Sequence, residues 1–369
     1  MTEGADGESR AAVAAVRALA AAGYRPAVTV SGGLSMAAAS RFCERRIDVP
    51  YAAKDPAGYA AAVRAELARP GYLGALAASD AALVALEVPV QGLLDKVACA
   101  EAARAAGIGV PPSRVFSSNA ALRAAAGELA FPVVVKPDIK RFMARRVTGP
   151  EGLDRVPAHD GSLIVQPYLS DDLRGVLGLA WHGRLLGAVH LRYLRVWPLP
   201  CGTVAAGSST APDSALEGRL EQLLAGYDGI FHADFAGDLL LDLNPRVHAT
   251  LPLAAASGVD LVAMYCDLLQ GRDPEPARGR HGILFRWIEG DLRSAVYRVR
   301  RRQLGLASAL ADLRPRRGTV HGYESLSDPG PMLTRLRYLP RQYRRRAERI
   351  AVERRPARPP AGGDGLAPR

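Results

Sequence analysis

Two apolar segments joined by a short turn, at residues 230–246, constrain the fold of this chain more than any other stretch. The segment reads IFHADFAGDLLLDLNPR. Apolar runs on both sides of a glycine-containing turn are typical of a β-hairpin. Alternation along the second strand places Asp242 and Asn244 on one face and Leu241 and Leu243 on the other. The sequence therefore predicts a hairpin that gathers polar groups on one side.

The length of the turn decides whether Asp234, on the first strand, joins that polar face. A three-residue loop centred on Gly237 sets Asp234 diagonally across from Asp242 on the same face, with Cα atoms about 7–8 Å apart. A two-residue loop would reverse the parity of the pairing. Two carboxylates and the amide oxygen of Asn244 are hard ligands that suit Mg²⁺ or Mn²⁺. We expect the three-residue loop and a cation site; a hairpin whose polar residues only face water is the alternative.

The overall composition sets the class of protein. The 369 residues can bury a substantial core and suggest two or three domains. Four scattered cysteines without a CxxC pair argue against a disulfide framework or a zinc site and suit a reducing compartment. No apolar run reaches membrane-spanning length, and the acidic N-terminus has no signal-type apolar core. We therefore expect a cytoplasmic protein.

Lysine is rare in this arginine-rich chain, which makes its few positions informative. A lysine supplies a compact point charge where arginine supplies a planar fork. The four lysines are Lys54, Lys96, Lys136 and Lys140, and the only asparagines are Asn119 and Asn244. Lys136 ends the apolar strand predicted over 131–137, where a charge meets either water or an anion.

Strand and helix signals alternate along the first ninety residues, which indicates a small α/β layer. Helices are predicted over 11–22, 36–46, 59–68 and 81–86, and strands over 26–30, 48–51 and 73–78. Farther along, a strand over 163–169 runs into a loop, and the arginine-bearing segment after residue 191 follows a predicted hairpin.

Five elements, taken in order, resemble the ATP-grasp superfamily, the fold of D-alanine–D-alanine ligase, biotin carboxylase and related carboxylate–amine ligases. They are Asp95-Lys96 followed by 107–111, the strand 131–137, the segment 166–169, Asp234, and 242–246 followed by 258–261. The match covers residues 90–272. Residues 193–202 (YLRVWPLPCG) and 328–331 most resemble a branch described as predicted ATP-dependent carboligases.

The resemblance implies an α/β (α+β) chain with an ATP-grasp fold. A pre-grasp α/β domain would cover residues 1–90 and the ATP-grasp domain residues 91–272, with a hinge near 166–170. A basic, partly helical extension would follow over 273–345, and a disordered tail over 346–369.

The resemblance also implies roles for individual residues. Lys96 and Lys136 would contact the phosphates of ATP, and Arg246 would stabilise the acyl phosphate. The metal ligands for Mg²⁺, or Mn²⁺, would be Asp234, Asp242 and Asn244. The adenosine site would be formed by Val134, Gln166, Pro167, Tyr168, Leu169, Asp172 and Leu241, with Asp172 at the ribose. Arg195 is a further candidate for the substrate carboxylate, because guanidinium pairs bidentately with such a group; a surface cation is the alternative.

Two departures from the family pattern bear on the chemistry. Asp242 stands where the family usually has Glu, and its shorter side chain favours one ion over two. The loop after Lys136 is usually glycine-rich, but residues 138–146 read DIKRFMARR. Phosphate contact would then come from Lys140, Arg145 or Arg146, unless these charges only face water.

Taken together, the resemblance implies an ATP-dependent ligase of the EC 6.3 type that joins a small carboxylate to an amine. A phosphotransferase on the same fold is an alternative. A third hypothesis is a binding module whose basic tail contacts nucleic acid or an anionic membrane, because residues 291–359 hold 18 Arg and 6 acidic residues. Aromatic residues are sparse among those arginines, so we expect solvated helix faces and no nucleic-acid partner. A homodimer is compatible with the sequence.

Overall fold

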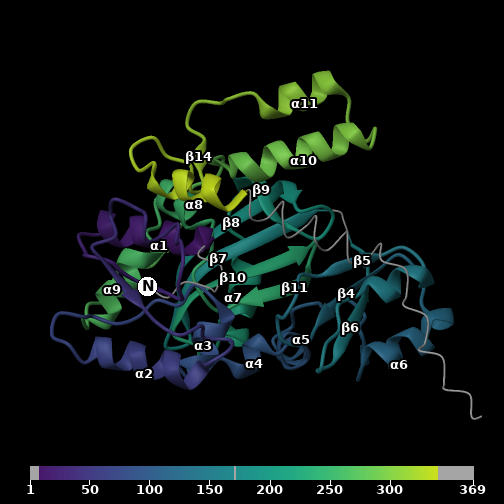
Figure 1. Ribbon diagram of the computed structural model, residues 1–369, viewed down its shortest axis with the longest axis horizontal. Coiled ribbons are helices and arrows are strands. Elements are labelled where there is room, and N and C mark those ends of the chain that lie inside the picture. The colour runs from purple at the N-terminus through teal and green to yellow at the C-terminus, as the bar shows by residue number, and fades with distance from the viewer. Residues whose placement is uncertain (1–7, 170–171, 340–369) are drawn as a thin grey trace, which may run out of the picture.

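The computed structural model describes residues 8–169 and 172–339, and Figure 1 shows the arrangement of their elements. The predicted disordered tail over 346–369 lies outside the described residues. The same holds for residues 340–345 of the predicted basic extension and for residue 170, the last of the predicted hinge.

The N-terminal part forms a small parallel pair of strands with helices around it. Its elements are α1 (Arg10–Ala21), β1 (Ala27–Val30), β2 (Arg45–Asp48), α2 (Pro56–Leu67) and α3 (Asp80–Ala85), with β1 paired to β2. The predicted helix over 36–46 is wrong, because residues 36–42 form turns and β2 begins at Arg45. A distant carboxylate holds these turns: Asp328 accepts hydrogen bonds from Ser40 Oγ at 2.7 Å and from Arg41 N at 2.9 Å. The predicted strand over 73–78 is also absent.

A small antiparallel sheet follows, with strand order β3-β6-β4-β5. Its apolar side packs on the two short helical segments α6 and η2. The elements of this part are α4 (Gln91–Leu94), α5 (Lys96–Ala105), β3 (Arg114–Phe116), α6 (Asn119–Ala124), η1 (Ala126–Glu128), β4 (Val133–Pro137), β5 (Arg145–Val147), η2 (Pro150–Arg155) and β6 (Leu163–Pro167).

The larger sheet has the order β11-β10-β7-β8-β9-β13-β14, with β12 paired to β8. One face packs on α1, α8 and α9, and the other on α4, α5 and α7 (Figure 1). The elements are β7 (Leu173–Trp181), β8 (Arg184–Trp197), β9 (Thr203–Ser209), α7 (Ser214–Leu223), β10 (Gly229–Ala236), β11 (Leu239–Asn244), α8 (Leu251–Ala256), α9 (Leu261–Leu269), β12 (Ala277–Arg278), β13 (Leu284–Arg286), α10 (Ile288–Arg300), α11 (Leu306–Leu313) and β14 (Val320–His321).

The C-terminal part is joined to the body of the protein by main-chain pairing. Strands β12, β13 and β14 all belong to the large sheet. Strands on both sides of the predicted boundary at residue 272 are therefore part of one sheet. Helix α10 packs on β8 and β9, with α11 against it. Within the described residues, no helix is both long enough and apolar enough to cross a membrane.

The hairpin β10–β11 differs from the predicted one in a way that preserves the polar face. Its turn has two residues, because Ala236 pairs with Leu239, so the predicted three-residue loop is wrong. A β-bulge between the pairs Phe235–Leu240 and Asp234–Asp242 adds one residue, Leu241, to the second strand. One extra residue restores the parity that the shorter turn reverses. Asp234 therefore lies directly opposite Asp242 instead of on a diagonal.

Candidate functional site

A cavity of about 470 Å³ lies between the small sheet and the bulged hairpin of the large sheet. Strands β4 and β6 line one side, and β8, β10 and β11 line the other. Twelve of the fourteen predicted site residues line it: Lys96, Val134, Lys136, Gln166, Pro167, Tyr168, Leu169, Asp234, Leu241, Asp242, Asn244 and Arg246. The bulge explains why neighbours Leu241 and Asp242 both face the cavity, which simple alternation would not allow.

The acidic residues of the hairpin are held by donors from other strands and helices. Asp242 accepts a hydrogen bond from Lys96, at the start of α5, and Asp234 accepts one from the hydroxyl of Tyr193 on β8. Burial alone would raise the pKa of Asp242, but the charges of Lys96, Lys140 and Lys136 lower it well below the usual range. Asp242 is therefore ionised at neutral pH.

Three of the four lysines in this arginine-rich chain, Lys96, Lys136 and Lys140, lie close enough to Asp242 to lower its pKa. Lys136 is 8% exposed and donates to the carbonyl oxygen of Leu241 at 2.8 Å. Its pKa falls to about 8, because burial disfavours the ammonium more than Asp242 favours it. The pKa of Lys96 is raised, since its pairing with Asp242 outweighs the burial that would lower it. Lys54, on the surface, takes no part.

The end of strand β6 and the residues after it line the cavity with backbone groups and with the ring of Tyr168. Gln166 pairs with Val134 of β4 in register and donates its side-chain amide to Ser113 Oγ at 2.9 Å. The backbone N–H of Tyr168 donates to the carbonyl oxygen of Pro132 at 3.1 Å. The guanidinium of Arg146 lies 4.3 Å from the centre of the Tyr168 ring. These contacts hold the segment 166–169 at the edge of the cavity.

Arg246 is fixed on the cavity wall by an acid from the N-terminal part. It pairs with Asp80, the first residue of α3, and donates to Asn244 Oδ1 at 2.8 Å. Burial would raise the pKa of Asp80, and the charges of Arg246 and Lys140 lower it below its usual value. Because the oxygen of Asn244 is engaged by Arg246, the amide faces Asp242 through its nitrogen, 3.4 Å from Asp242 Oδ2.

Several cavity residues had a weaker signal in the sequence or none. Tyr193 and Lys140 belong to segments that the resemblance singled out, and His248 follows shortly after the segment 242–246. Arg10 carried no motif at all. Its place on the wall comes from the packing of α1 against α8 and α9, which a local pattern does not reveal.

Two predicted site residues lie outside the cavity. Asp172, expected at the ribose, pairs with Arg174 and with Arg192 at 3.4 Å, and it lines a different hollow beside His190. The hydrogen bond from Arg174 lowers the pKa of Asp172. Asp172 was predicted to face the ribose. In the structure it forms ion pairs at the surface and does not line the cavity.

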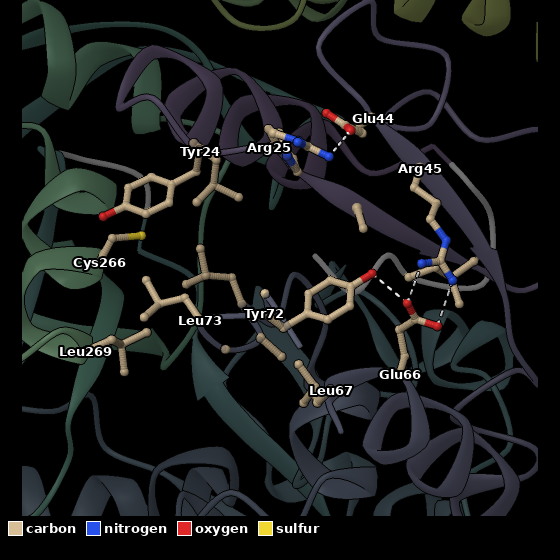
Figure 2. A pocket seen from close by; sticks show the side chains of 18 of the residues that line it. Tyr24, Arg25, Glu44, Arg45, Glu66, Leu67, Tyr72, Leu73, Cys266 and Leu269 are labelled. Carbon is tan, nitrogen blue, oxygen red and sulfur yellow. Dashed lines mark hydrogen bonds and ion pairs between the residues drawn. The ribbon is translucent and has the colours of Figure 1, made fainter. Parts of the chain in front are cut away.

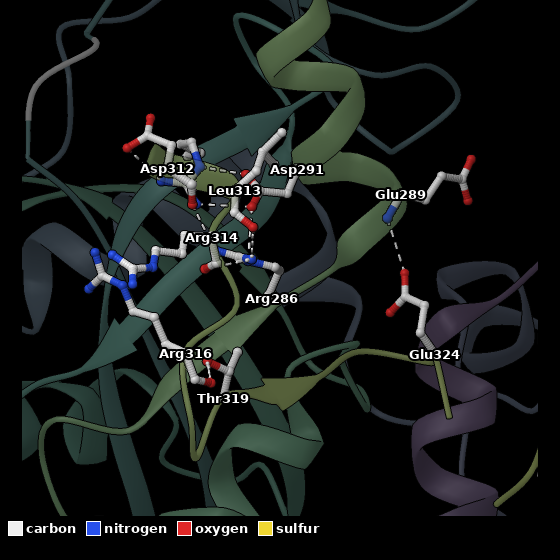
Figure 3. Close-up of polar contacts among 10 residues, drawn as sticks. Arg286, Glu289, Asp291, Asp312, Leu313, Arg314, Arg316, Thr319 and Glu324 are labelled. Carbon is white, nitrogen blue, oxygen red and sulfur yellow. Dashed lines mark hydrogen bonds and ion pairs between the residues drawn. The ribbon is translucent and has the colours of Figure 1, made fainter. Parts of the chain in front are cut away.

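Arg195, expected at the substrate carboxylate, is the second residue outside the cavity. It forms a bidentate pair with Asp291 of α10, with 2.9 Å between Nη2 and Oδ2. Asp291 is fully buried and also pairs with Arg286, as Figure 3 shows. The guanidinium fork that suits a carboxylate therefore already holds one within the protein.

This correction gives a prediction about stability. Arg195→Gln should lower the free energy of unfolding by about 3 kcal/mol, because it leaves a buried carboxylate with one cation fewer. Urea denaturation of the variant measures this change. The exposed Arg25→Gln is the control and should change stability by less than about 1 kcal/mol. A stable Arg195→Gln protein with a raised KM for an organic substrate would contradict the structural role.

A second cavity, of about 530 Å³, lies where α1, α2 and α9 meet (Figure 2). Its polar side chains are paired with one another: Glu66 accepts from Tyr72 at 2.6 Å and from Arg45 at 2.9 Å, and Arg25 pairs with Glu44. The hydrogen bond from Tyr72 lowers the pKa of Glu66. These groups brace the wall of the hollow.

Comparison with known proteins identifies the fold. No protein-family model and no curated protein sequence matches the chain. Among solved structures, L-amino acid ligase from Bacillus licheniformis is 14% identical, over 73% of each chain, with a TM-score of 0.53. The biotin carboxylase domain of the Hydrogenobacter thermophilus 2-oxoglutarate carboxylase is 13% identical over 74% of this chain and 71% of that one, with a TM-score of 0.56.

A further solved structure gives the same result. The N5-carboxyaminoimidazole synthetase from Staphylococcus aureus is 10% identical over 75% of this chain and 78% of that one, with a TM-score of 0.54. These structures share one architecture. The chain has the ATP-grasp fold. The likeness covers about three quarters of the chain, and its low identity assigns no substrate.

The acidic groups of this ATP-grasp fold suit a metal that is shared with a ligand. The described part of the chain contains no cluster of three or more His, Cys, Asp or Glu side chains able to enclose an ion. Asp234 and Asp242 face each other across the hairpin, and Asn244 Oδ1 is taken by Arg246. Mg²⁺ is commonly bound by one or two carboxylates together with substrate phosphates. The donor set therefore fits Mg²⁺ through the two aspartates, with Asn244 in a supporting position.

The loop after Lys136 is anchored although it lacks glycines. Asp138 accepts from the backbone N–H groups of Ile139 and Ser162, at 2.7 and 2.9 Å, and contacts His159 Nε2 at 2.8 Å. Burial would raise the pKa of Asp138, but these hydrogen bonds lower it. Beyond this anchor, Lys140 lines the cavity, and burial lowers the pKa of its ammonium.

Proposed function

We propose that the chain is an ATP-dependent ligase that activates a small carboxylate as an acyl phosphate and joins it to an amine. The observation that carries the proposal is that three cations, Lys96, Lys136 and Arg246, line the same cavity between two sheets as a pair of facing carboxylates, Asp234 and Asp242. Phosphoryl transfer requires mainly positioning and charge stabilisation, and this cavity supplies both.

Each part of the cavity has a role in the proposal. Lys96 and Lys136 bind the phosphates of ATP as point charges, and Asp234 and Asp242 hold Mg²⁺. The bound Mg²⁺ neutralises charge on the phosphates and orients them. Val134 and Leu241 enclose the adenine ring, and the segment 166–169 presents main-chain groups to its edge. The neighbours support these ligands, because two of the solved structures contain MgADP or ADP.

The proposed reaction has two steps. A carboxylate oxygen of the substrate attacks the γ-phosphorus, the bond to the β-phosphate oxygen breaks, and ADP leaves. Arg246, held by Asp80, stabilises the charge on the acyl phosphate. An amine nitrogen then attacks the acyl carbon, phosphate leaves, and the nitrogen loses a proton to form the amide.

The test is Mg²⁺-dependent release of ADP and phosphate from ATP with pools of carboxylic acids and amino acids. We expect release with Mg²⁺, and with Mn²⁺ in its place, and a product whose mass is the sum of two substrates less water. A product heavier than one substrate by HPO₃ would instead indicate a phosphotransferase. Failure to bind ATP or ADP in the presence of Mg²⁺ would contradict both.

A further inference from the structure

Arg10 is a cation on the cavity wall whose N–H donors have no partner among residues 8–169 and 172–339. It is the first residue of α1, and the Ser9 side chain caps this helix by accepting from Ala12 N at 3.1 Å. The guanidinium carbon of Arg10 lies 3.5 Å from the centre of the Trp287 ring. With the residues that the structure describes, Arg10 forms neither a hydrogen bond nor an ion pair. Its N–H donors are therefore free to bind a ligand.

The acids next to Arg10 do not neutralise it by direct contact. Glu289 is taken by Arg335, at 2.7 and 2.8 Å, and accepts from the hydroxyl of Tyr323 at 2.8 Å. Glu324 accepts from the backbone N–H of Glu289 at 3.2 Å and lies beside α1 in Figure 3. Burial lowers the pKa of Arg10 to about 10 in spite of the attraction of Glu324, so the group remains a cation at neutral pH.

The face of Trp287 fixes the orientation of this cation. Trp287 is buried and immediately precedes α10, and its backbone N–H donates to the carbonyl oxygen of Ala205 on β9 at 2.7 Å, which ties it to the large sheet. An arginine stacked on an aromatic face keeps its planar fork directed sideways. Arg10 also lines the cavity, and a planar guanidinium with donors left over suits a planar, two-oxygen anion.

The cavity near Arg10 has further groups suited to an anion. His248 stacks on the buried His232, with ring centres 3.8 Å apart, and its Nδ1 lies 2.9 Å from Thr250 Oγ1. Burial lowers the pKa of His248 well below its usual value, and the charges of His232, Arg246, Arg10 and Lys140 lower it further. Arg10, Lys140 and Arg246 line the same cavity as His248. Of these cations, Arg246 is already held by Asp80.

We propose that Arg10 binds a carboxylate of the organic substrate and is a specificity-determining residue of the site. This inference rests on the proposed function, because it assigns the substrate class of the same cavity. In the sequence, Arg10 precedes the predicted ATP-grasp domain, residues 91–272, and Trp287 follows it. Substrate selection therefore depends on packing of the N-terminal helix against the C-terminal part of the chain.

The test is titration of the MgADP-loaded protein with three probes: a mixture of standard amino acids, a mixture of short dicarboxylates, and inorganic phosphate. Binding is followed by calorimetry and by Trp287 fluorescence in a background in which Trp181 and Trp197 are replaced by phenylalanine. We expect a carboxylate pool to bind the parent protein. Arg10→Gln should weaken that binding at least about tenfold, through the loss of a charge-assisted bidentate contact.

Companion variants separate binding from folding. Arg10→Lys keeps the charge but loses the fork, so it should weaken binding less than Arg10→Gln does. Arg25→Gln removes an exposed cation near the same helix and should behave as the parent. The Kd for MgADP should change less than about twofold in all three variants, which shows that the fold and the nucleotide site are intact.

The outcomes distinguish this inference from the proposed function. Equal responses of the parent and Arg10→Gln to every probe, including no response from either, would overturn the role of Arg10. An Arg10-dependent response to phosphate alone would overturn the carboxylate assignment. If the parent protein itself does not bind MgADP, that result would contradict the proposed function instead.

Discussion

Replacing Asp242 with alanine should lower the rate of Mg²⁺-dependent ATP turnover at least about a hundredfold. A loss on the order of 10² in rate is typical when one charge-stabilising group is removed from a site. The variant removes one of two facing carboxylates and leaves Lys96, Lys136 and Lys140 without the acid that their charges surround. The rate of ADP release under saturating ATP measures the effect.

Two further substitutions make this result specific. Asp238→Ala removes an exposed carboxylate from the turn of the same hairpin and should leave turnover within about twofold of the parent. Asp242→Glu keeps the carboxylate on a side chain one methylene longer and should retain Mg²⁺-dependent turnover. Parent-like turnover by Asp242→Ala would contradict the assignment of the hairpin as the metal site.

Lys136→Met should weaken the binding of MgATP by about a hundredfold. Lys136 is buried, so water screens its charge only weakly. A buried charge-assisted contact to phosphate contributes about 2–3 kcal/mol to binding. Methionine keeps a similar length and lacks the charge. Calorimetric titration with MgADP or MgATP measures the loss. Lys54→Met, at the exposed lysine, is the matched control and should bind nucleotide as the parent does.

The same lysine predicts a pH dependence. Because burial lowers the pKa of Lys136 to about 8, its ammonium is charged below that pH and loses its proton above it. Nucleotide affinity of the parent should therefore be full near pH 7 and fall as the pH rises through 8. Lys136→Met should lack this decrease between pH 7 and 9. A parent protein whose affinity is flat over that range would contradict the contact between Lys136 and phosphate.

The hairpin shows how local sequence and tertiary pairing share the determination of a site. Alternation predicted correctly that Asp242 and Asn244 would face the same side, together with Asp234. It was wrong about the turn, because a two-residue turn and a bulge at Leu241 give the same parity as a three-residue turn. Parity depends only on the number of residues counted, so the pattern does not show whether the extra residue lies in the turn or in the strand.

Arginines show a second limit of prediction from sequence. Arg195 and Arg10 have the same guanidinium chemistry, and the sequence analysis offered Arg195 as a candidate ligand of a carboxylate, with a surface cation as the alternative. The structure pairs Arg195 with the buried Asp291, nearly a hundred residues away, and leaves Arg10 without such a partner. Asp172, predicted at the ribose, is paired with Arg174 in the same manner and does not line the cavity. Whether a charge is free or paired depends on what the fold places beside it.

The sequence alone determined the fold class and the order of the site elements. Retained lysines, a hairpin with spaced carboxylates and an Asn-Pro-Arg turn are local features, and each one depends on residues a few positions apart. The tertiary structure decided which charges meet. It paired Arg246 with Asp80, brought Trp287 under Arg10, and joined the C-terminal strands to the large sheet. Charge pairing acts over a few ångströms between residues that are hundreds of positions apart, so only the folded chain determines it.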